Sequence, residues 1–313
     1  MRGQSAQDQP RLRKTPRSVE AATQSGWLEE TVKIGVGMGK PPEPPGIWVD
    51  IAHFAREAER IGFESIWLGE HVTSPVHCES LSPTFEGGQV PGFFDPLVAL
   101  GRASAVTSRV KLGTGVTLVP EHHPLRLAKA IASLDRFSAG RVIFGVGPGW
   151  NKEERAIMGG DLRRPWTQTR EGVLAMKQLW CSEEAEFHGE FYDFPPVRCF
   201  PPPVSKPHPP VLLSGVSPKL VERMVDWGDG WLAFRTTPAE LEARIRELRT
   251  LAPRAGRNPE DFEISMYSWE PSRALMRAYE MAGAHRFIVQ TPGLSSERET
   301  TAYLERVAEA IDL

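Results

Sequence analysis

Short apolar runs alternate with longer amphipathic stretches from Val32 to the end of the chain. The runs at residues 142–144 and 211–213 are apolar at successive positions, which is typical of parallel strands buried on both faces. Read in this way, the chain contains eight strands, at residues 32–38, 65–69, 110–118, 141–146, 211–214, 230–234, 262–267 and 286–290.

The stretches between these strands have the spacing of amphipathic helices. Apolar residues recur every three or four positions at Ile47, Ile51, Phe54, Ala58 and Ile61, at Leu241, Ile245, Leu248 and Leu251, and at Leu304, Val307, Ala308 and Ile311. Eight strands, each followed by a helix, predict the α/β class and a single (β/α)8 TIM barrel over residues 32–313. An open, doubly wound sheet is the alternative.

Residues 1–31 lack this pattern, being polar, basic and nearly free of large apolar residues. Such a segment cannot bury enough apolar surface to offset its ordering entropy, so we expect a disordered extension. The net charge of the 313-residue chain is -3, which provides no global field to attract nucleic acid or an anionic membrane, and neither partner is expected.

The cysteines and the apolar runs indicate the cellular compartment of the protein. Cys78, Cys181 and Cys199 are widely spaced and form no CxxC pair, which fits a reducing cytoplasm. No apolar run approaches the roughly 18 residues of a membrane helix, and the first residues lack the apolar core of a signal peptide. We expect a soluble, cytoplasmic protein.

Two segments interrupt the regular alternation. Residues 72–94 follow the second strand, where barrel loops build active sites. Residues 187–210 contain the proline runs 195–196 and 201–203, and we expect an extended hairpin and a proline-stiffened excursion before the fifth strand. Insertions on this rim shape substrate pockets.

Glycines gather where the strands end, which is where barrels carry their catalytic groups. The candidates for ligand contact at these ends are Gly37, Thr114, Gly115, Val116, Gly147 and Gly149. Glycine weakens a strand and usually marks a bulge, a bend or a close backbone approach. Two interpretations stay open: a large, flat ligand lies across the barrel mouth, or the glycines relieve crowding where strands converge.

A short segment after the fifth strand has the composition of a phosphate site: Ser214, Gly215, Val216 and Ser217. Ser217 can cap a helix that begins near Pro218, and the N–H groups at a helix start attract a phosphate. Arg235, at the end of the next strand, could add a charge-assisted contact. A plain capped helix is the alternative.

His71 is the candidate for proton transfer. It ends the apolar second strand beside Glu70, which could orient its ring. A lone histidine is more often structural, but a strand end favours a catalytic role. His77 and Cys78, or His122 and His123, could join it as metal ligands. Because no H-x-H or HExxH pattern is present, no metal site is expected.

Several long motifs occur in the order found in one known family. They are AERIGFESIWLGEHV at residues 58–72, LGTGVTLVPEHHPLRLAKAIASLDRFSAGRVIFGVGPGWNKEE at 112–154, PHPPVLLSGVSPKLVERMVDWGDGW at 207–231 and AGAHRFIVQTPG at 282–293. Together they resemble the bacterial luciferase-like superfamily, particularly its coenzyme F420-dependent oxidoreductases. The resemblance spans residues 32–313.

The resemblance implies a flavin or deazaflavin across the C-terminal mouth of the barrel, and a homodimer. It implies a non-prolyl cis peptide bond at Gly115-Val116, with Gly147 and Gly149 near the cofactor. It places Ser214 and Gly215 at the cofactor phosphate, where related sequences usually carry two glycines, and it matches His71 to the family's active-site histidine.

The implied reaction is hydride transfer between C5 of reduced F420 and a small unsaturated or carbonyl substrate. His71 would exchange the accompanying proton, Glu70 would orient His71, and Trp150 and Trp166 are candidate pocket walls. One alternative is an FMN-dependent monooxygenase that uses O2 and is supplied by a separate flavin reductase. Another is a cofactor-binding protein without turnover. The loops at residues 72–94 and 161–210 show no charge cluster that identifies the substrate, and Arg163, Arg164 and His188 are interpreted as a solvated face.

Overall fold

A computed structural model describes residues 32–39, 49–80 and 92–313. The predicted disordered extension, residues 1–31, lies outside the described residues, as do residues 81–91 of the loop after the second strand. The described residues belong to one compact unit, Val32–Leu313.

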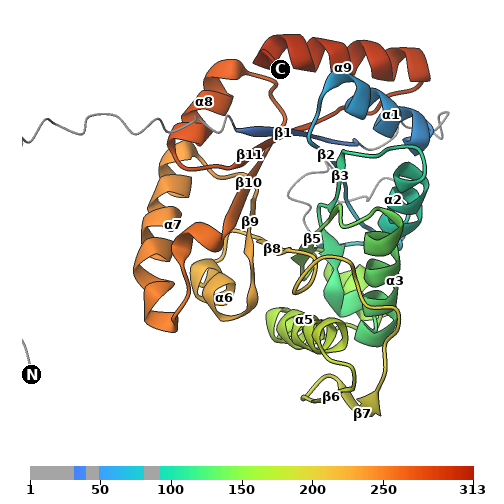
Figure 1. Cartoon of the computed structure of the whole chain (residues 1–313), viewed down its shortest axis with the longest axis vertical. Helices are drawn as coiled ribbons and strands as arrows, with labels where there is room; N and C mark the ends of the chain where they lie inside the picture. Colours follow the sequence, from blue (N-terminus) through green and yellow to red (C-terminus); the bar gives the residue numbers. More distant parts are fainter. Residues whose placement is uncertain (1–31, 40–48, 81–91) are drawn as a thin grey trace, which may run out of the picture. The chain divides into compact units, whose positions relative to one another are not determined.

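Within this described part, eight parallel strands close into a barrel with helices arranged around it (Figure 1). The strands are β1 (Lys33–Gly37), β2 (Ser65–Leu68), β3 (Lys111–Thr114), β5 (Val142–Gly147), β8 (Val211–Ser214), β9 (Gly230–Ala233), β10 (Glu263–Ser268) and β11 (Arg286–Gln290). They pair in the order β3-β2-β1-β11-β10-β9-β8-β5, and β3 also pairs with β5. This closure confirms the TIM barrel and excludes the open sheet.

The predicted third strand is divided in two. β3 ends at Thr114, and β4 (Thr117–Leu118) continues in the same direction and pairs with the end of β5. The bond between Gly115 and Val116 is a cis peptide bond, at the position implied by the family resemblance. The break directs the chain towards the mouth of the barrel.

The helices follow the predicted apolar spacing. They are α1 (Ile51–Ile61), α2 (Pro96–Ser104), α3 (Pro124–Phe137), α4 (Lys152–Ile157), α5 (Pro165–Cys181), α6 (Leu220–Trp227), α7 (Pro238–Leu251), α8 (Arg273–Met281) and α9 (Glu297–Ile311). Asp50 caps the start of α1 and Ser296 caps that of α9. The predicted faces of α1, α7 and α9 are turned to the core, although Ile61 and Leu251 are only half-buried and Ile47 lies outside the described residues.

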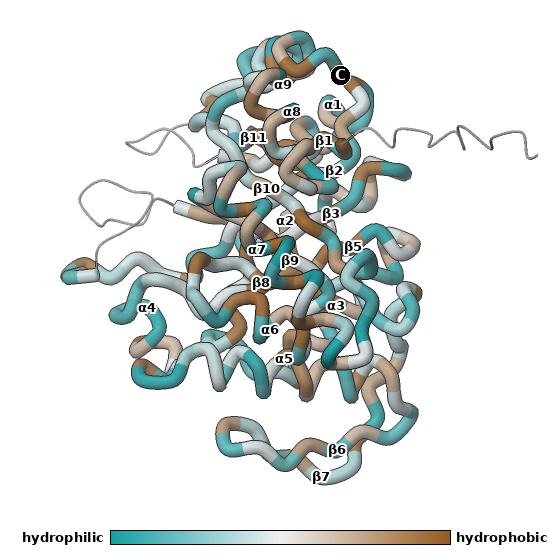
Figure 2. The backbone as a smooth tube through the Cα atoms, turned by 90° about the vertical axis from the view of Figure 1, so that its left-hand side faces the viewer, coloured by the Kyte–Doolittle hydropathy of each residue, from teal (hydrophilic) through white to brown (hydrophobic). Residues whose placement is uncertain are grey.

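The proline-rich segment forms the expected hairpin. β6 (Ala185–His188) pairs antiparallel with β7 (Asp193–Val197), so the hairpin begins two residues before the predicted start at 187. Figures 1 and 2 show it at the edge of the barrel, beside α5, with hydrophobic and hydrophilic residues mixed along it. The chain then returns to β8 through two cis prolines, Pro201 and Pro207.

The barrel interior is filled by its own apolar cluster: Trp67, Ile143, Leu212, Leu232, Tyr267 and Ile288. Glycines make room for these side chains. A Cβ at Gly113 would collide with the ring of Trp67, and one at Gly145 would collide with the carbonyl oxygen of Thr114. Crowding therefore explains the glycines inside the strands, whereas those at the mouth belong to the cavity described next.

Candidate active site

A cavity of about 1080 Å³ lies at the carboxyl ends of the strands. Residues at or directly after the ends of β1, β2, β5, β8, β9, β10 and β11 line it. TIM barrels hold their ligands at this end, and ligand pockets generally measure about 300–1,000 Å³. The cavity therefore has room for a large cofactor together with a small substrate.

The floor of the cavity is the upper part of the apolar cluster inside the barrel. Trp231 lines the cavity together with Leu232 and Tyr267, which belong to that cluster. Val116, the residue after the cis peptide bond, and Phe234 pack against the same cluster. A flat aromatic ring would find a continuous apolar surface here.

His71 lines the cavity where β2 ends, and its side chain is held from behind. Nδ1 of His71 lies 2.6 Å from Oε2 of Glu154, whose side chain is fully buried. The other carboxylate oxygen of Glu154 accepts hydrogen bonds from the backbone N–H groups of Val72, at 2.7 Å, and Thr73, at 3.1 Å. The carboxylate is thus fixed in place, and it fixes the imidazole ring in turn.

Aromatic rings complete the surroundings of His71. The centre of its ring lies 5.2 Å from that of Phe93 and 5.5 Å from that of Trp150, both of which line the cavity. Only 9% of the His71 side chain is exposed. A proton exchanged at this ring is therefore shielded from bulk water.

The prediction that Glu70 orients His71 is wrong. The Glu70 carboxylate accepts a hydrogen bond from the backbone N–H of Leu118, at 2.6 Å, and lies 3.0 Å from Nε2 of His122. Burial opposes protonation of His122, but the hydrogen bond and charge of Glu70 raise the pKa of His122 above its ordinary value. Glu70 thus ties the chain after the cis peptide bond to β2, while Glu154 performs the role expected of Glu70.

The segment after β8 also departs from its prediction. Helix α6 begins at Leu220 with Lys219 as its N-cap, two residues later than expected. The hydroxyl of Ser217 accepts a hydrogen bond from the Lys219 N–H at 3.3 Å. Within the described part of the chain, the backbone N–H groups of Gly215, Val216 and Ser217 donate no hydrogen bond. All three residues line the cavity, so these donors are positioned for an anionic group.

Two positive side chains lie on the same side of the cavity. Arg235 follows β9 with a φ of 49°, and Arg244 of α7 also lines the cavity, where it donates to the carbonyl oxygen of Pro218 at 3.3 Å. Trp166 lies against Gly215, since a Cβ at that glycine would be 3.2 Å from the indole. The arrangement suits a phosphate held by backbone N–H groups and arginines.

Most of the predicted site residues are brought together. The residues that line the cavity are Glu70, His71, Gly115, Val116, Gly147, Gly149, Ser214, Gly215, Val216, Ser217 and Arg235, and the predicted walls Trp150 and Trp166 line it as well. Gly37 and Thr114 do not. A Cβ at Gly37 would collide with Gln290, and the buried hydroxyl of Thr114 donates to the Gly145 carbonyl at 2.8 Å. Both serve the barrel wall.

Sequence reasoning missed Glu154, Tyr267, Trp231 and Arg244. Glu154 lies within the family motif at 112–154, but it is 83 residues from His71 and no local spacing connects the two. Tyr267 occupies strand β10, where alternation could have marked it as inward-facing. Trp231 precedes the inward-facing Leu232 on β9 and packs in the outer core, so alternation gives no reason to place it at the cavity. Arg244 had no signal that distinguishes it from other arginines on a helix surface.

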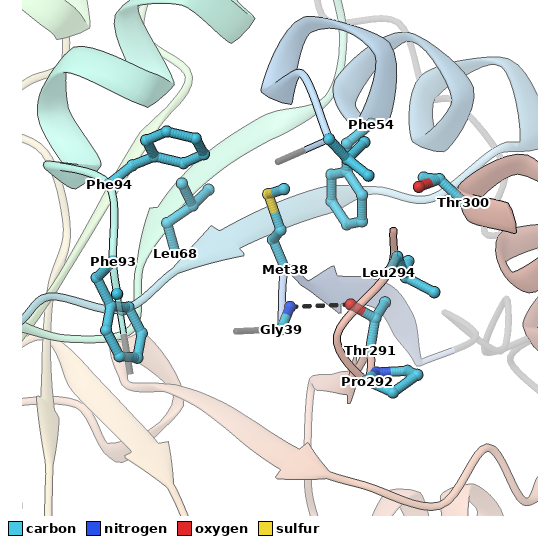
Figure 3. A pocket seen from close by; sticks show the side chains of 13 residues that line it. Met38, Gly39, Phe54, Leu68, Phe93, Phe94, Thr291, Pro292, Leu294 and Thr300 are labelled. Atoms are coloured by element: carbon cyan, nitrogen blue, oxygen red, sulfur yellow. Dashed lines mark hydrogen bonds between the residues drawn. The ribbon is translucent and has the colours of Figure 1, made fainter. Parts of the chain in front are cut away.

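A smaller apolar pocket adjoins the main cavity (Figure 3). It measures about 30 Å³ and shares Met38, Gly39 and Phe93 with the main cavity. Leu68 and Phe54 form its apolar walls, and the N–H of Gly39 donates to the hydroxyl of Thr291 at 2.9 Å. The side of the cavity next to His71 is therefore extended by apolar surface.

Two of the histidines considered as metal ligands have other partners. The described residues contain no group of three His, Cys, Asp or Glu side chains arranged to hold a metal ion. His122 is paired with Glu70, and His123 caps the start of α3.

This barrel carries a histidine and an apolar floor at its mouth, in a cavity with room for a large planar ligand. The family model described as luciferase-like monooxygenase matches residues 33–310. The chain belongs to the luciferase-like monooxygenase family.

Individual relatives show the range of this family. An uncharacterised protein of Mycobacterium tuberculosis is 37% identical over 265 residues, which cover 81% of this chain and 91% of the relative. An F420-dependent glucose-6-phosphate dehydrogenase of Kineococcus radiotolerans is 30% identical, over 79% of this chain and 71% of the relative. The monooxygenase RslO1 of Streptomyces bottropensis has the same fold, with a TM-score of 0.71, 21% identity, and coverage of 89% of this chain and 98% of the other.

Membership of this family, together with the dehydrogenase relative, supports an enzyme of oxidoreductase or monooxygenase type. Among the described helices, none has the length and apolarity required to cross a lipid bilayer.

Proposed function

We propose that this protein is an F420-dependent oxidoreductase that transfers a hydride between the deazaflavin and a small organic substrate at the barrel mouth. The observation that carries the proposal is the placement of His71, held by Glu154, in one cavity with an apolar floor and the backbone N–H groups of residues 215–217. The F420-dependent relative at 30% identity supports this choice of cofactor.

The residues present fit such a cofactor. The apolar floor formed by Val116, Leu232 and Tyr267 supports a planar ring. The backbone N–H groups of residues 215–217 and the guanidinium of Arg235 would hold the phosphate. Gly215 has a φ of 149°, a conformation that side chains rarely adopt, so its backbone can approach the phosphate closely. Ser214 adds a side chain at a position where the phosphate would be held by backbone N–H groups alone.

The protein's part in the reaction is orientation, exclusion of water and proton transfer. A bound deazaflavin supplies or accepts the hydride at its C5. When a carbonyl substrate is reduced, its oxygen gains a proton, and His71 donates that proton from the wall of the cavity. Glu154 orients the ring through its contact with Nδ1.

The surroundings of His71 indicate the class of substrate. Near the His71 ring the cavity is lined by Phe93 and Trp150 and continues into the apolar side pocket. Among the charged residues that line the cavity, Arg235, Glu240 and Arg244 lie on the side that we assign to the phosphate. Glu70 also lines it, but its carboxylate is engaged by Leu118 and His122. We therefore propose a neutral substrate with an apolar substituent.

The arginine-rich rim does not alter this choice. Arg164 is paired with Glu190 at 2.6 Å and His188 with Asp193 at 2.6 Å, all with exposed side chains. Neither Arg164 nor His188 lines the cavity. They form the solvated face that their sequence indicated.

Titration of the purified protein with oxidised F420 and, separately, with FMN tests the cofactor. Trp150, Trp166, Trp231 and Trp269 line the cavity, so binding will quench tryptophan fluorescence. We expect micromolar binding of F420 and much weaker binding of FMN. The reverse preference would favour an FMN-dependent monooxygenase supplied by a flavin reductase, and binding of neither would contradict the proposal.

A pair of glycine variants locates the binding site. Gly215→Val places a branched side chain against Trp166 and in the path of the phosphate, so F420 affinity should fall by about tenfold or more. Gly101→Val is the matched control, since a side chain at Gly101 on α2 meets no atom within 4 Å. Equal affinities of the two variants would place the phosphate elsewhere.

A further inference from the structure

Glu121 is a buried acid that the proposed reaction does not use. It ends the 3-10 helix η2 (Val119–Glu121), directly before His122, and only 5% of the residue is exposed. Neither of its carboxyl oxygens has a hydrogen-bond partner among the described residues. A buried polar group without a partner is costly and calls for an explanation.

The carboxyl group of Glu121 lies behind a turn that lines the cavity. This turn, which we call the 147–150 turn, consists of Gly147, Pro148, Gly149 and Trp150. A Cβ added at Gly149 would be 3.6 Å from Oε1 of Glu121. Gly149 itself has a φ of 77° and faces the cavity.

Arg155 holds the same turn from behind. Its guanidinium donates to the carbonyl oxygen of Pro148 at 3.0 Å and to that of Gly149 at 2.5 Å, and only 4% of the residue is exposed. The positive charge of Arg155 acts on Glu121, yet no hydrogen bond joins the two side chains. Because Glu121 forms no hydrogen bond with Arg155, the guanidinium remains available to both carbonyl oxygens.

The other charged groups that face Glu121 are carboxylates. They are the carboxylate of Glu154 on α4, which is paired with His71, and that of Glu70 after β2, which is paired with His122. Burial, followed by the negative charges of Glu154 and Glu70, raises the pKa of Glu121 to about 8, while Arg155 opposes the shift. Glu121 is therefore a neutral acid at pH 7.

We propose that Glu121 is a positioning residue whose neutral acid form keeps the 147–150 turn in place, and that its ionisation loosens the turn. An anionic Glu121 would compete with the carbonyls of Pro148 and Gly149 for the guanidinium of Arg155. Trp150 packs against His71, so a displaced turn alters both the cofactor side of the cavity and the surroundings of the catalytic ring. The consequence for turnover rests on the proposed function, but the movement of the turn does not.

The movement of the 147–150 turn is measured on the cofactor-free protein by following tryptophan emission between pH 6 and pH 10. This pH range includes the ionisation of Glu121 near pH 8. We expect one emission change in the wild type with a midpoint near pH 8. Glu121→Gln keeps a neutral side chain of the same shape at every pH, so the change should be absent. Trp150→Phe should reduce its amplitude because it removes the reporter on the turn.

Glu309→Gln, which alters an exposed carboxylate of α9, is the matched control and should titrate as the wild type does. Persistence of the emission change in Glu121→Gln, or its absence from the wild type, would overturn the proposal. If the protein binds F420, wild-type affinity should also fall about fivefold or more between pH 7 and pH 9 and that of Glu121→Gln should not. Binding that falls equally in both proteins would also overturn it, whereas failure to bind any cofactor contradicts the proposed function alone.

Discussion

At the scale of single residues, the proposed proton transfer depends on which carboxylate holds His71. Glu70 is the neighbour in sequence, but successive side chains at a strand end point in different directions. Glu70 therefore turns to Leu118 and His122, and Glu154 approaches His71 from α4. Sequence could identify the histidine from its position, but not a partner 83 residues away.

Variants of His71 and Glu154 are expected to lower turnover to different degrees. His71→Ala removes the ring to which we assign proton transfer and should lower kcat by about 10²–10⁴-fold, with F420 affinity retained. Glu154→Gln keeps the ring but loosens its orientation, and kcat should fall on the order of 10–100-fold. Steady-state kinetics with reduced F420 measure both effects.

Glu153→Gln is the control for this series. Glu153 is adjacent in sequence, but its carboxylate accepts from the N–H of Glu79 and does not line the cavity. Its kcat should equal that of the wild type. A loss as large as that of Glu154→Gln would show that α4 as a whole, rather than the contact with His71, supports turnover.

At the scale of elements, the sequence predicted all eight barrel strands because buried parallel strands are continuously apolar. The predicted boundaries of the elements were less accurate. Helix α6 begins at Leu220 rather than near Pro218, because residues 218 and 219 form a turn that keeps the preceding N–H groups available. The break between β3 and β4 has no signal in hydrophobic spacing, and only the family resemblance located it.

The amino ends of the strands make a prediction about stability. Arg286 of β11 is buried, and its guanidinium bonds to Glu64 before β2 and to Glu263 of β10. Arg286→Met leaves both carboxylates without this partner and should lower the free energy of unfolding by about 3 kcal/mol. Chemical denaturation measures the loss, with the exposed Arg298→Met as control. F420 affinity should be unchanged, because the cavity lies at the opposite end.

The contact between Arg286 and Glu64 makes stability depend on pH. Burial of Glu64 raises the pKa of its carboxyl group, but the hydrogen bond and charge of Arg286 lower it further, so the pKa lies below its ordinary value. The resulting stabilisation is complete above the ordinary pKa of glutamate and is lost as pH falls towards the lowered value. The wild type should therefore lose more stability than Arg286→Met on acidification. Parallel acid denaturation curves for the two proteins would contradict this.

At the scale of the whole molecule, the mouth of the barrel has a polar side, which we assign to the phosphate, and an apolar side around His71. We expect neutral ketones, enones or secondary alcohols to exceed their carboxylated analogues in kcat/KM by about 10–100-fold, because a polar group buried without a partner costs about 1–3 kcal/mol. Assays with matched pairs of neutral and carboxylated compounds test this division. A preference for the anionic member of each pair would contradict it.

The most direct test of the proposed reaction follows the hydride itself. Reduced F420 that carries deuterium at both C5 positions is mixed with the protein and a neutral carbonyl substrate in the absence of oxygen, and the product is examined by mass spectrometry. The account predicts that one deuterium appears on the reduced carbon and that His71→Ala slows its appearance. Product that carries no deuterium, or that forms only with reduced FMN and oxygen, would contradict it.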